Sequence, residues 1–115
     1  MHALDVLGEP VRRRIVEELA RGARPAGALA DVLHGEFGIS QPATSRHLRV
    51  LKEAGVVESA VDAQRRVYSL TPAAVTDVTE WAQRVSLFWT QRLDALETEV
   101  ARGQTARKNV ERNLS

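Results

Sequence analysis

Apolar residues recur at helical spacing in several separate stretches of the chain, and a proline or a glycine stands at or near most of their ends. Such punctuation is typical of helix starts and stops. The spacing predicts one short helical turn, three helices of ordinary length and one long final helix. The predicted segments are residues 3–7, 10–22, 25–35, 40–55 and 72–101.

Between the fourth and fifth segments the pattern changes from helical to extended. Residues 56–61 and 65–70 are rich in β-branched side chains and are separated by the polar break Asp62-Ala63-Gln64, which predicts a β-hairpin. Two helices joined by a glycine-containing turn and followed by a hairpin form a winged helix-turn-helix. The predicted fold class is therefore mainly α with a β-hairpin wing.

The predicted helix of residues 40–55 has two unlike faces. Thr44, Leu48 and Leu51 share one side, whereas the other side carries small polar and basic residues. Residues 41–52 contain no acidic side chain. The major groove of DNA admits one helix and presents acceptor atoms that arginine can pair with. This segment therefore has the character of a recognition helix.

The final helix carries a long apolar stripe at alternating four- and three-residue spacing. A domain of this size cannot easily cover such a face alone, so we expect it to meet the same helix of a second subunit. Residues 103–115 are polar and are expected to be disordered, which confines the DNA-binding and dimerisation domain to residues 1–102. The stripe consists of Val78, Ala82, Val85, Trp89, Leu93, Leu96 and Val100, widened by Trp81 and Phe88.

Charge and composition restrict the chemistry. The chain has 16 Lys and Arg against 15 Asp and Glu, a net charge of +1, so any positive surface for nucleic acid must be local. The absence of cysteine excludes disulfides, thiolate metal sites and thiol redox sensing. Nothing approaches a transmembrane span and the N-terminus lacks the apolar core of a signal peptide, so we expect a cytoplasmic protein with no membrane partner.

An enzyme is the least favoured interpretation. Ser40, Ser45 and His47 form the one conceivable group of nucleophile and base. On a helix, Ser45 and His47 point roughly 200° apart at about 100° per residue, which rules out a dyad. No glycine-rich phosphate loop is present, and no cofactor is expected.

Three consecutive arginines, Arg12, Arg13 and Arg14, follow Pro10. We interpret at least two of them as solvated, with i,i+4 pairs from Arg13 and Arg14 to the glutamates four residues later. The alternative gives one of the three a phosphate contact.

Three segments together resemble the ArsR-type (arsenic-repressor-like) winged-helix transcriptional regulators, and the resemblance covers residues 4–100. They are residues 7–15, 39–57 and 65–70, which read LGEPVRRRI, ISQPATSRHLRVLKEAGVV and RRVYSL. The resemblance implies a homodimeric repressor whose first and last helices pair across a two-fold axis. Symmetry then predicts a palindromic double-stranded DNA operator with half-sites about 34 Å apart.

The same resemblance implies two groups of contacting residues. The DNA-binding group is Gln41, Thr44, Ser45, Arg46, His47, Arg49, Lys52, Arg65 and Arg66. The dimer-interface group is Leu4, Leu7, Trp81, Val85, Phe88, Trp89, Leu93 and Leu96.

The chain also departs from the family in ways that bear on sensing. Metal-sensing members carry cysteines in the helix before the recognition helix, where this chain reads ALADVL at residues 28–33, or Asp and His pairs on the last helix, which here has no histidine. No metal site is therefore expected. Residues 88–97 resemble a branch without recognisable metal ligands, so the sequence does not identify a small-molecule inducer. The wing tip, Asp62-Ala63-Gln64, lacks the family's usual glycine.

A second interpretation comes from a different functional class. The low net charge and the apolar last helix suit a winged-helix module for protein docking or dimerisation, without specific DNA binding. Salt dependence separates the two, because phosphate contacts weaken by orders of magnitude between low and moderate salt and apolar docking does not.

Overall fold

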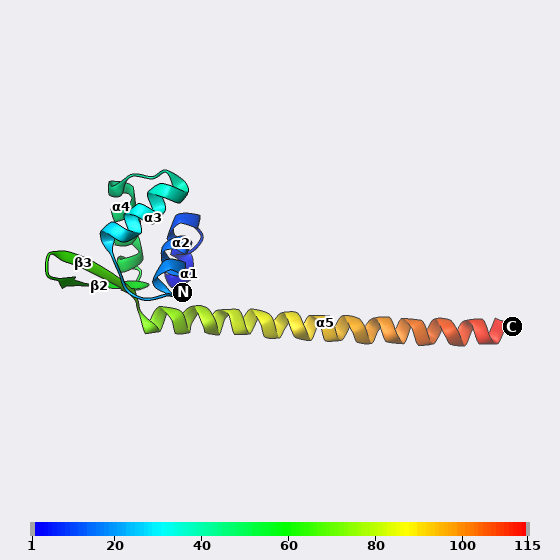
Figure 1. Cartoon of the computed structure of the whole chain (residues 1–115). Helices are drawn as coiled ribbons and strands as arrows, with labels where there is room; N and C mark the ends of the chain where they lie inside the picture. The colour runs from blue at the N-terminus through cyan, green and yellow to red at the C-terminus, as the bar shows by residue number, and fades with distance from the viewer. Residues whose placement is uncertain (1, 115) are drawn as a thin grey trace. The chain divides into compact units, whose positions relative to one another are not determined.

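The computed structural model describes the backbone of residues 2–114 and the side chains of residues 3–103. Its contacts divide the chain into two units, Met1–Thr79 and Glu80–Ser115. The first unit contains every element except most of the last helix (Figure 1). The elements are α1 (His2–Val6), α2 (Pro10–Leu19), β1 (Arg24–Pro25), α3 (Ala26–Phe37), α4 (Gln41–Glu53), β2 (Val57–Asp62), β3 (Arg65–Leu70) and α5 (Pro72–Leu114).

Side-chain caps fix where α2 and α4 begin. The Ser40 hydroxyl accepts the backbone N–H of Ala43 at 3.2 Å, which caps α4 at the residue where the predicted helix begins. The carboxylate of Glu9 caps α2 in the same way, by accepting the N–H of Arg12 at 2.9 Å. Each helix has a proline in its first turn, where the missing N–H costs nothing.

The core of the first unit lies where α2, α3 and α4 meet. Ile15, Leu29, Leu33, Leu48 and Leu51 are at most 2% exposed and come from all three helices. Each such side chain contributes about 2 kcal/mol through its burial. These contacts hold α4 against α2 and α3, so that only its opposite face is open.

Helix α3 ends at Phe37, two residues later than predicted. Gly35 lies within the helix, whereas Gly38 takes the left-handed conformation (φ 69°) and its N–H donates to the carbonyl of His34. Either glycine could have ended the helix, and the sequence alone favoured the wrong one. The turn between α3 and α4 is consequently shorter than expected.

The wing is a three-stranded antiparallel sheet in the order β1-β3-β2. The predicted hairpin is confirmed, with its register running from Val57 opposite Leu70 to Asp62 opposite Arg65. A two-residue turn joins the strands, and Ala63 in it has φ 58°, a conformation that glycine adopts at less cost. The two-residue strand β1 was not predicted, because so short a segment carries no alternating pattern and is extended by its pairing with β3.

In the second unit the helix α5 continues to Leu114, past the predicted boundary at residue 102. Its side chains from residue 80 to residue 103 are exposed. No helix in the described part of the chain has the length and apolar character needed to cross a membrane.

Candidate nucleic-acid interface

The open face of α4 carries most of the side chains predicted to contact DNA. Gln41, Ser45, Arg46, Arg49 and Lys52 are all exposed. Within the described residues, neither Arg46 nor Arg49 forms a hydrogen bond or an ion pair through its guanidinium group. Both groups are therefore available to base edges or phosphates, with no internal contact to break.

Thr44 is the exception, and its place in the predicted DNA-binding group is wrong because the side chain is buried. Its side chain is 1% exposed and lies on the inner face of α4 with Leu48 and Leu51. The physical reason is helical periodicity, because residues four and seven positions apart share one side of a helix. Thr44 packs into the core and does not reach the groove-facing surface.

Burial also leaves the Thr44 hydroxyl oxygen without a hydrogen-bond partner among the described residues. Thr44→Val keeps the shape of the side chain and removes the unpaired group. We expect it to raise the free energy of unfolding by about 1 kcal/mol, because a buried unsatisfied hydroxyl is costly. Operator affinity should stay unchanged. Thermal or urea unfolding measures the change in stability, and a DNA titration measures the affinity. A variant that is more stable but binds DNA more weakly would show that Thr44 does contact DNA.

Two cations from different elements converge at the junction of α4 and the wing. Lys52 Nζ, near the end of α4, donates to Ser59 Oγ on β2 at 2.9 Å, and Arg66 Nη1 on β3 donates to the same oxygen at 3.3 Å. Neither cation forms an ion pair with a carboxylate of the described residues. Two neighbouring cations without a counter-ion attract an anion such as a phosphate.

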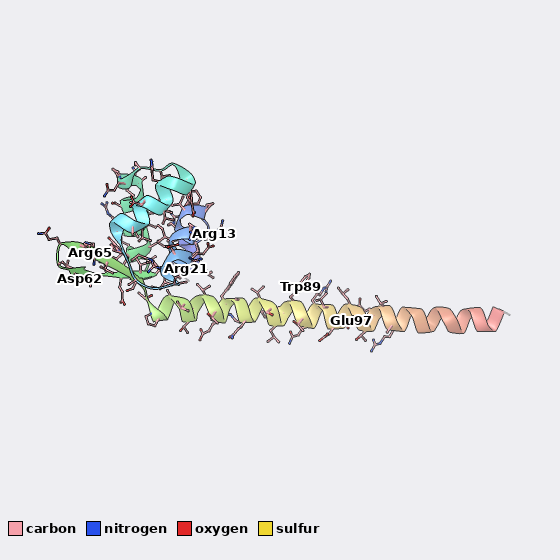
Figure 2. The ribbon with its side chains drawn as sticks, viewed as in Figure 1. Arg13, Arg21, Asp62, Arg65, Trp89 and Glu97 are labelled. Carbon is pink, nitrogen blue, oxygen red and sulfur yellow. The ribbon has the colours of Figure 1, made fainter. Side chains whose placement is uncertain are left out.

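The arginine at the tip of the wing, Arg65, is only weakly paired within the protein. Arg65 Nη2 lies 3.5 Å from Asp62 Oδ2, and both side chains are more than 60% exposed. Figure 2 shows the pair at the end of the hairpin. An exposed pair of this kind is worth little in water, so Arg65 can exchange its carboxylate for a phosphate at small cost.

His47 faces α2. Its side chain is 22% exposed, and its Nδ1 atom lies 3.4 Å from Arg12 Nη1 and 3.8 Å from Glu9 Oε2. Sequence analysis did not associate these three residues, because 35 positions separate Arg12 from His47.

Arg13 and Arg14, two of the consecutive arginines of α2, have different environments. Arg14 forms the predicted pair with Glu18 at 3.0 Å and a two-pronged pair with Glu36, at 2.8 and 3.0 Å. These hydrogen bonds hold the pKa of the Glu36 carboxyl below its usual value and tie α2 to the last turn of α3. Arg13 is exposed (Figure 2), and its predicted pair with Glu17 is not formed within the described residues.

The residues predicted for the dimer interface fall in both units. In the first unit Leu4 is half-buried, and Leu7 packs against the core. In the second unit the remaining six are large apolar side chains exposed to solvent. They are Trp81, Val85, Phe88, Trp89, Leu93 and Leu96, with exposed fractions of 41–68%.

The first unit also contains an apolar hollow of about 240 Å³. It lies between α2, the ends of the hairpin and the first turns of α5, and its lining is uncharged. The lining residues are Leu7, Val16, Ala20, Val56, Leu70, Ala74, Val75, Val78 and Thr79. In the part of the chain with described side chains, no group of three or more His, Cys, Asp or Glu residues is placed to hold a metal ion.

Comparison with known proteins finds a matching domain family and similar transcriptional regulators. A family model described as a helix-turn-helix domain matches residues 7–60. The HTH-type transcriptional regulator Rv2034 of Mycobacterium tuberculosis is 38% identical over 91 residues, which cover 79% of this chain and 78% of that protein. The transcriptional repressor SdpR of Bacillus subtilis is 35% identical over 75 residues, covering 65% of this chain and 79% of the repressor.

The fold is shared with a solved structure that is itself a dimer. The homodimeric winged helix-turn-helix DNA-binding domain of Mb0332 from Mycobacterium bovis is described as belonging to a possible ArsR-family transcriptional regulator. It matches with a TM-score of 0.60 at 26% identity, covering 74% of this chain and 75% of that one.

Proposed function

Because this chain belongs to the ArsR family of winged helix-turn-helix transcriptional regulators, which bind DNA, we propose that it is a homodimeric repressor of a palindromic operator. In this proposal α4 lies in the major groove and the wing follows the adjacent backbone. The paired cations Lys52 and Arg66 are the observation that carries the proposal. A protein-docking module would have no use for two uncompensated cations beside an acid-free helix face.

The contacts divide by chemistry into two classes. Arg46 and Arg49, with Gln41 and Ser45, present donors from the open face of α4, and donors of this kind read purine edges in the major groove. Lys52 and Arg66 meet at a single hydroxyl between α4 and the wing, a position suited to one phosphate. Base contacts then specify the operator, and phosphate contacts set the orientation of the protein on it.

The stripe on α5 supports a symmetric dimer. Its spacing is the same in both directions from Trp89: Val85 and Leu93 lie four residues away, and Ala82 and Leu96 lie seven residues away. A two-fold interface requires a self-complementary surface. In an antiparallel pair centred on Trp89, Val85 of one protomer is level with Leu93 of its partner.

The size of the stripe is also adequate for a stable dimer. The exposed fractions of its large side chains correspond to roughly 700 Å² per protomer, close to the ~800 Å² that each partner of a standard interface buries. The homodimeric state of the Mb0332 domain supports the same assembly. Because a transcriptional regulator must reach the DNA that it binds, we expect the protein to act in the cytoplasm.

Substitutions at the paired cations test the DNA-binding proposal. Lys52→Gln and Arg66→Gln should each weaken binding to all duplexes alike and reduce the slope of log affinity against log salt by about 2, because each protomer of the dimer loses one phosphate contact. The matched control is Arg13→Gln, which removes an exposed arginine from α2. Fluorescence anisotropy at several salt concentrations measures the slopes; slopes equal to that of the unsubstituted protein would remove the phosphate from this junction.

A further inference from the structure

The side chain of Arg12 joins three elements of the first unit. Its Nε atom donates to the carbonyl oxygen of Val6, the last residue of α1, at 2.6 Å. Its Nη1 atom lies 3.4 Å from Nδ1 of His47, in the middle of α4. Its own backbone N–H is held by the capping carboxylate of Glu9. A single half-buried guanidinium thus connects the start of the chain to the recognition helix.

The contact between Arg12 and His47 bears on the tautomer of the His47 ring. Arginine is always charged and can only donate, so Nδ1 of His47 must accept. In a neutral imidazole whose Nδ1 accepts, the proton is on Nε2. Glu9 favours the opposite tautomer, but its Oε2 atom lies 3.8 Å from Nδ1, beyond hydrogen-bond distance. The shorter of the two contacts at Nδ1, the one with Arg12, therefore favours the form of His47 in which Nε2 is a donor.

A donor at Nε2 has the polarity that DNA requires. Phosphate oxygens, purine N7 and guanine O6 are all acceptors, whereas a ring with the proton on Nδ1 would present a lone pair from Nε2 and repel them. His47 follows Arg46 in α4 and keeps 22% of its side chain exposed, so the DNA contact that the family resemblance implies for His47 would use this donor.

We propose that Arg12 is a positioning residue for DNA recognition: it holds His47 as an Nε2–H donor and ties the recognition helix to the end of α1. Arg12 itself does not contact DNA. The inference rests on the proposed DNA-binding function, but its first test needs no DNA.

The first test measures which ring nitrogen of His47 carries the proton in the protein without DNA. At a pH where the ring is neutral, ring ¹⁵N chemical shifts should show the proton on Nε2. Arg12→Met keeps an unbranched apolar side chain and removes every hydrogen-bond donor. The variant should shift a large share of the His47 rings to the tautomer with the proton on Nδ1, where the Nδ1–H group can donate to Glu9. Arg13→Met should leave the ring unchanged. A proton on Nδ1 in the unsubstituted protein would overturn the proposal without any variant.

The second test separates positioning from direct contact. Arg12→Met should weaken operator binding roughly tenfold for each half-site, the size of one charge-assisted hydrogen bond, with an unchanged salt slope. In a His47→Ala background the same change should cost nothing further, because Arg12 acts through His47. A salt slope reduced by about 2 for the dimer would show that Arg12 contacts phosphate. Equal losses in both backgrounds would show that Arg12 acts independently of His47.

The two tests also distinguish failure of this inference from failure of the proposed function. Unsubstituted protein that does not distinguish an operator from a scrambled duplex would overturn the DNA-binding proposal. The ring measurement would still decide whether Arg12 sets the tautomer of His47. Circular dichroism confirms that the variants keep the helical fold before either comparison is made.

Discussion

Trp89→Glu is expected to yield a monomer that binds the operator at least a hundredfold more weakly than the unsubstituted protein. Trp89 is 63% exposed and stands at the centre of the symmetric stripe on α5. The substitution removes apolar contact from both protomers and places two carboxylates beside the two-fold axis. Loss of about 2–3 kcal/mol per protomer weakens dimerisation by roughly 4–6 kcal/mol.

Sedimentation velocity at micromolar concentration measures the assembly state. The matched control is Leu87→Glu: Leu87 is also exposed, at 57%, but its position two residues from Trp89 places it roughly 200° around the helix, away from the stripe. Leu87→Glu should remain a dimer. A dimeric Trp89→Glu protein, or a monomeric Leu87→Glu protein, would show that the stripe is not the interface.

Arg49→Ala is expected to weaken operator binding by about 1–3 kcal/mol, and by less on DNA of unrelated sequence. Arg49 projects from the open face of α4, and its guanidinium has no contact with other described residues that DNA would have to replace. An arginine in this position can donate twice to one guanine, through O6 and N7. Binding isotherms on the operator and on single-base variants measure the loss at each base pair.

The pattern of loss decides the role of Arg49. A penalty that disappears when one particular base pair is changed identifies the base that Arg49 reads. A uniform penalty on every duplex, with a salt slope reduced by about 2 for the dimer, would assign Arg49 to the backbone instead. Arg13→Ala serves as the matched control and should bind all duplexes like the unsubstituted protein.

Local signals were sufficient to predict most elements of the fold. Ser40 and Pro42 specified the start of α4, and the β-branched runs on either side of residues 62–64 specified the hairpin. The errors arose where tertiary structure decides between equal local signals. Gly35 and Gly38 are both plausible helix ends, and β1 is extended by pairing with β3.

The candidate site was only partly predictable for the same reason. The exposed residues of α4 followed from periodicity, and periodicity also placed Thr44 with Leu48 on the inner face, whereas the family resemblance implied a DNA contact. The partners of the predicted residues could not be found from spacing. Ser59 joins Lys52 to Arg66, and Arg12 meets His47 across 35 positions, through packing of elements that are distant in sequence.

The most direct test of the central claim is fluorescence anisotropy of the unsubstituted protein with the DNA upstream of its own gene. The titration is repeated at several salt concentrations beside a scrambled duplex. The account predicts tight binding that prefers the native DNA and weakens steeply with salt, as several phosphate contacts require. Weak binding without preference, insensitive to salt, would contradict it and favour a docking module in its place.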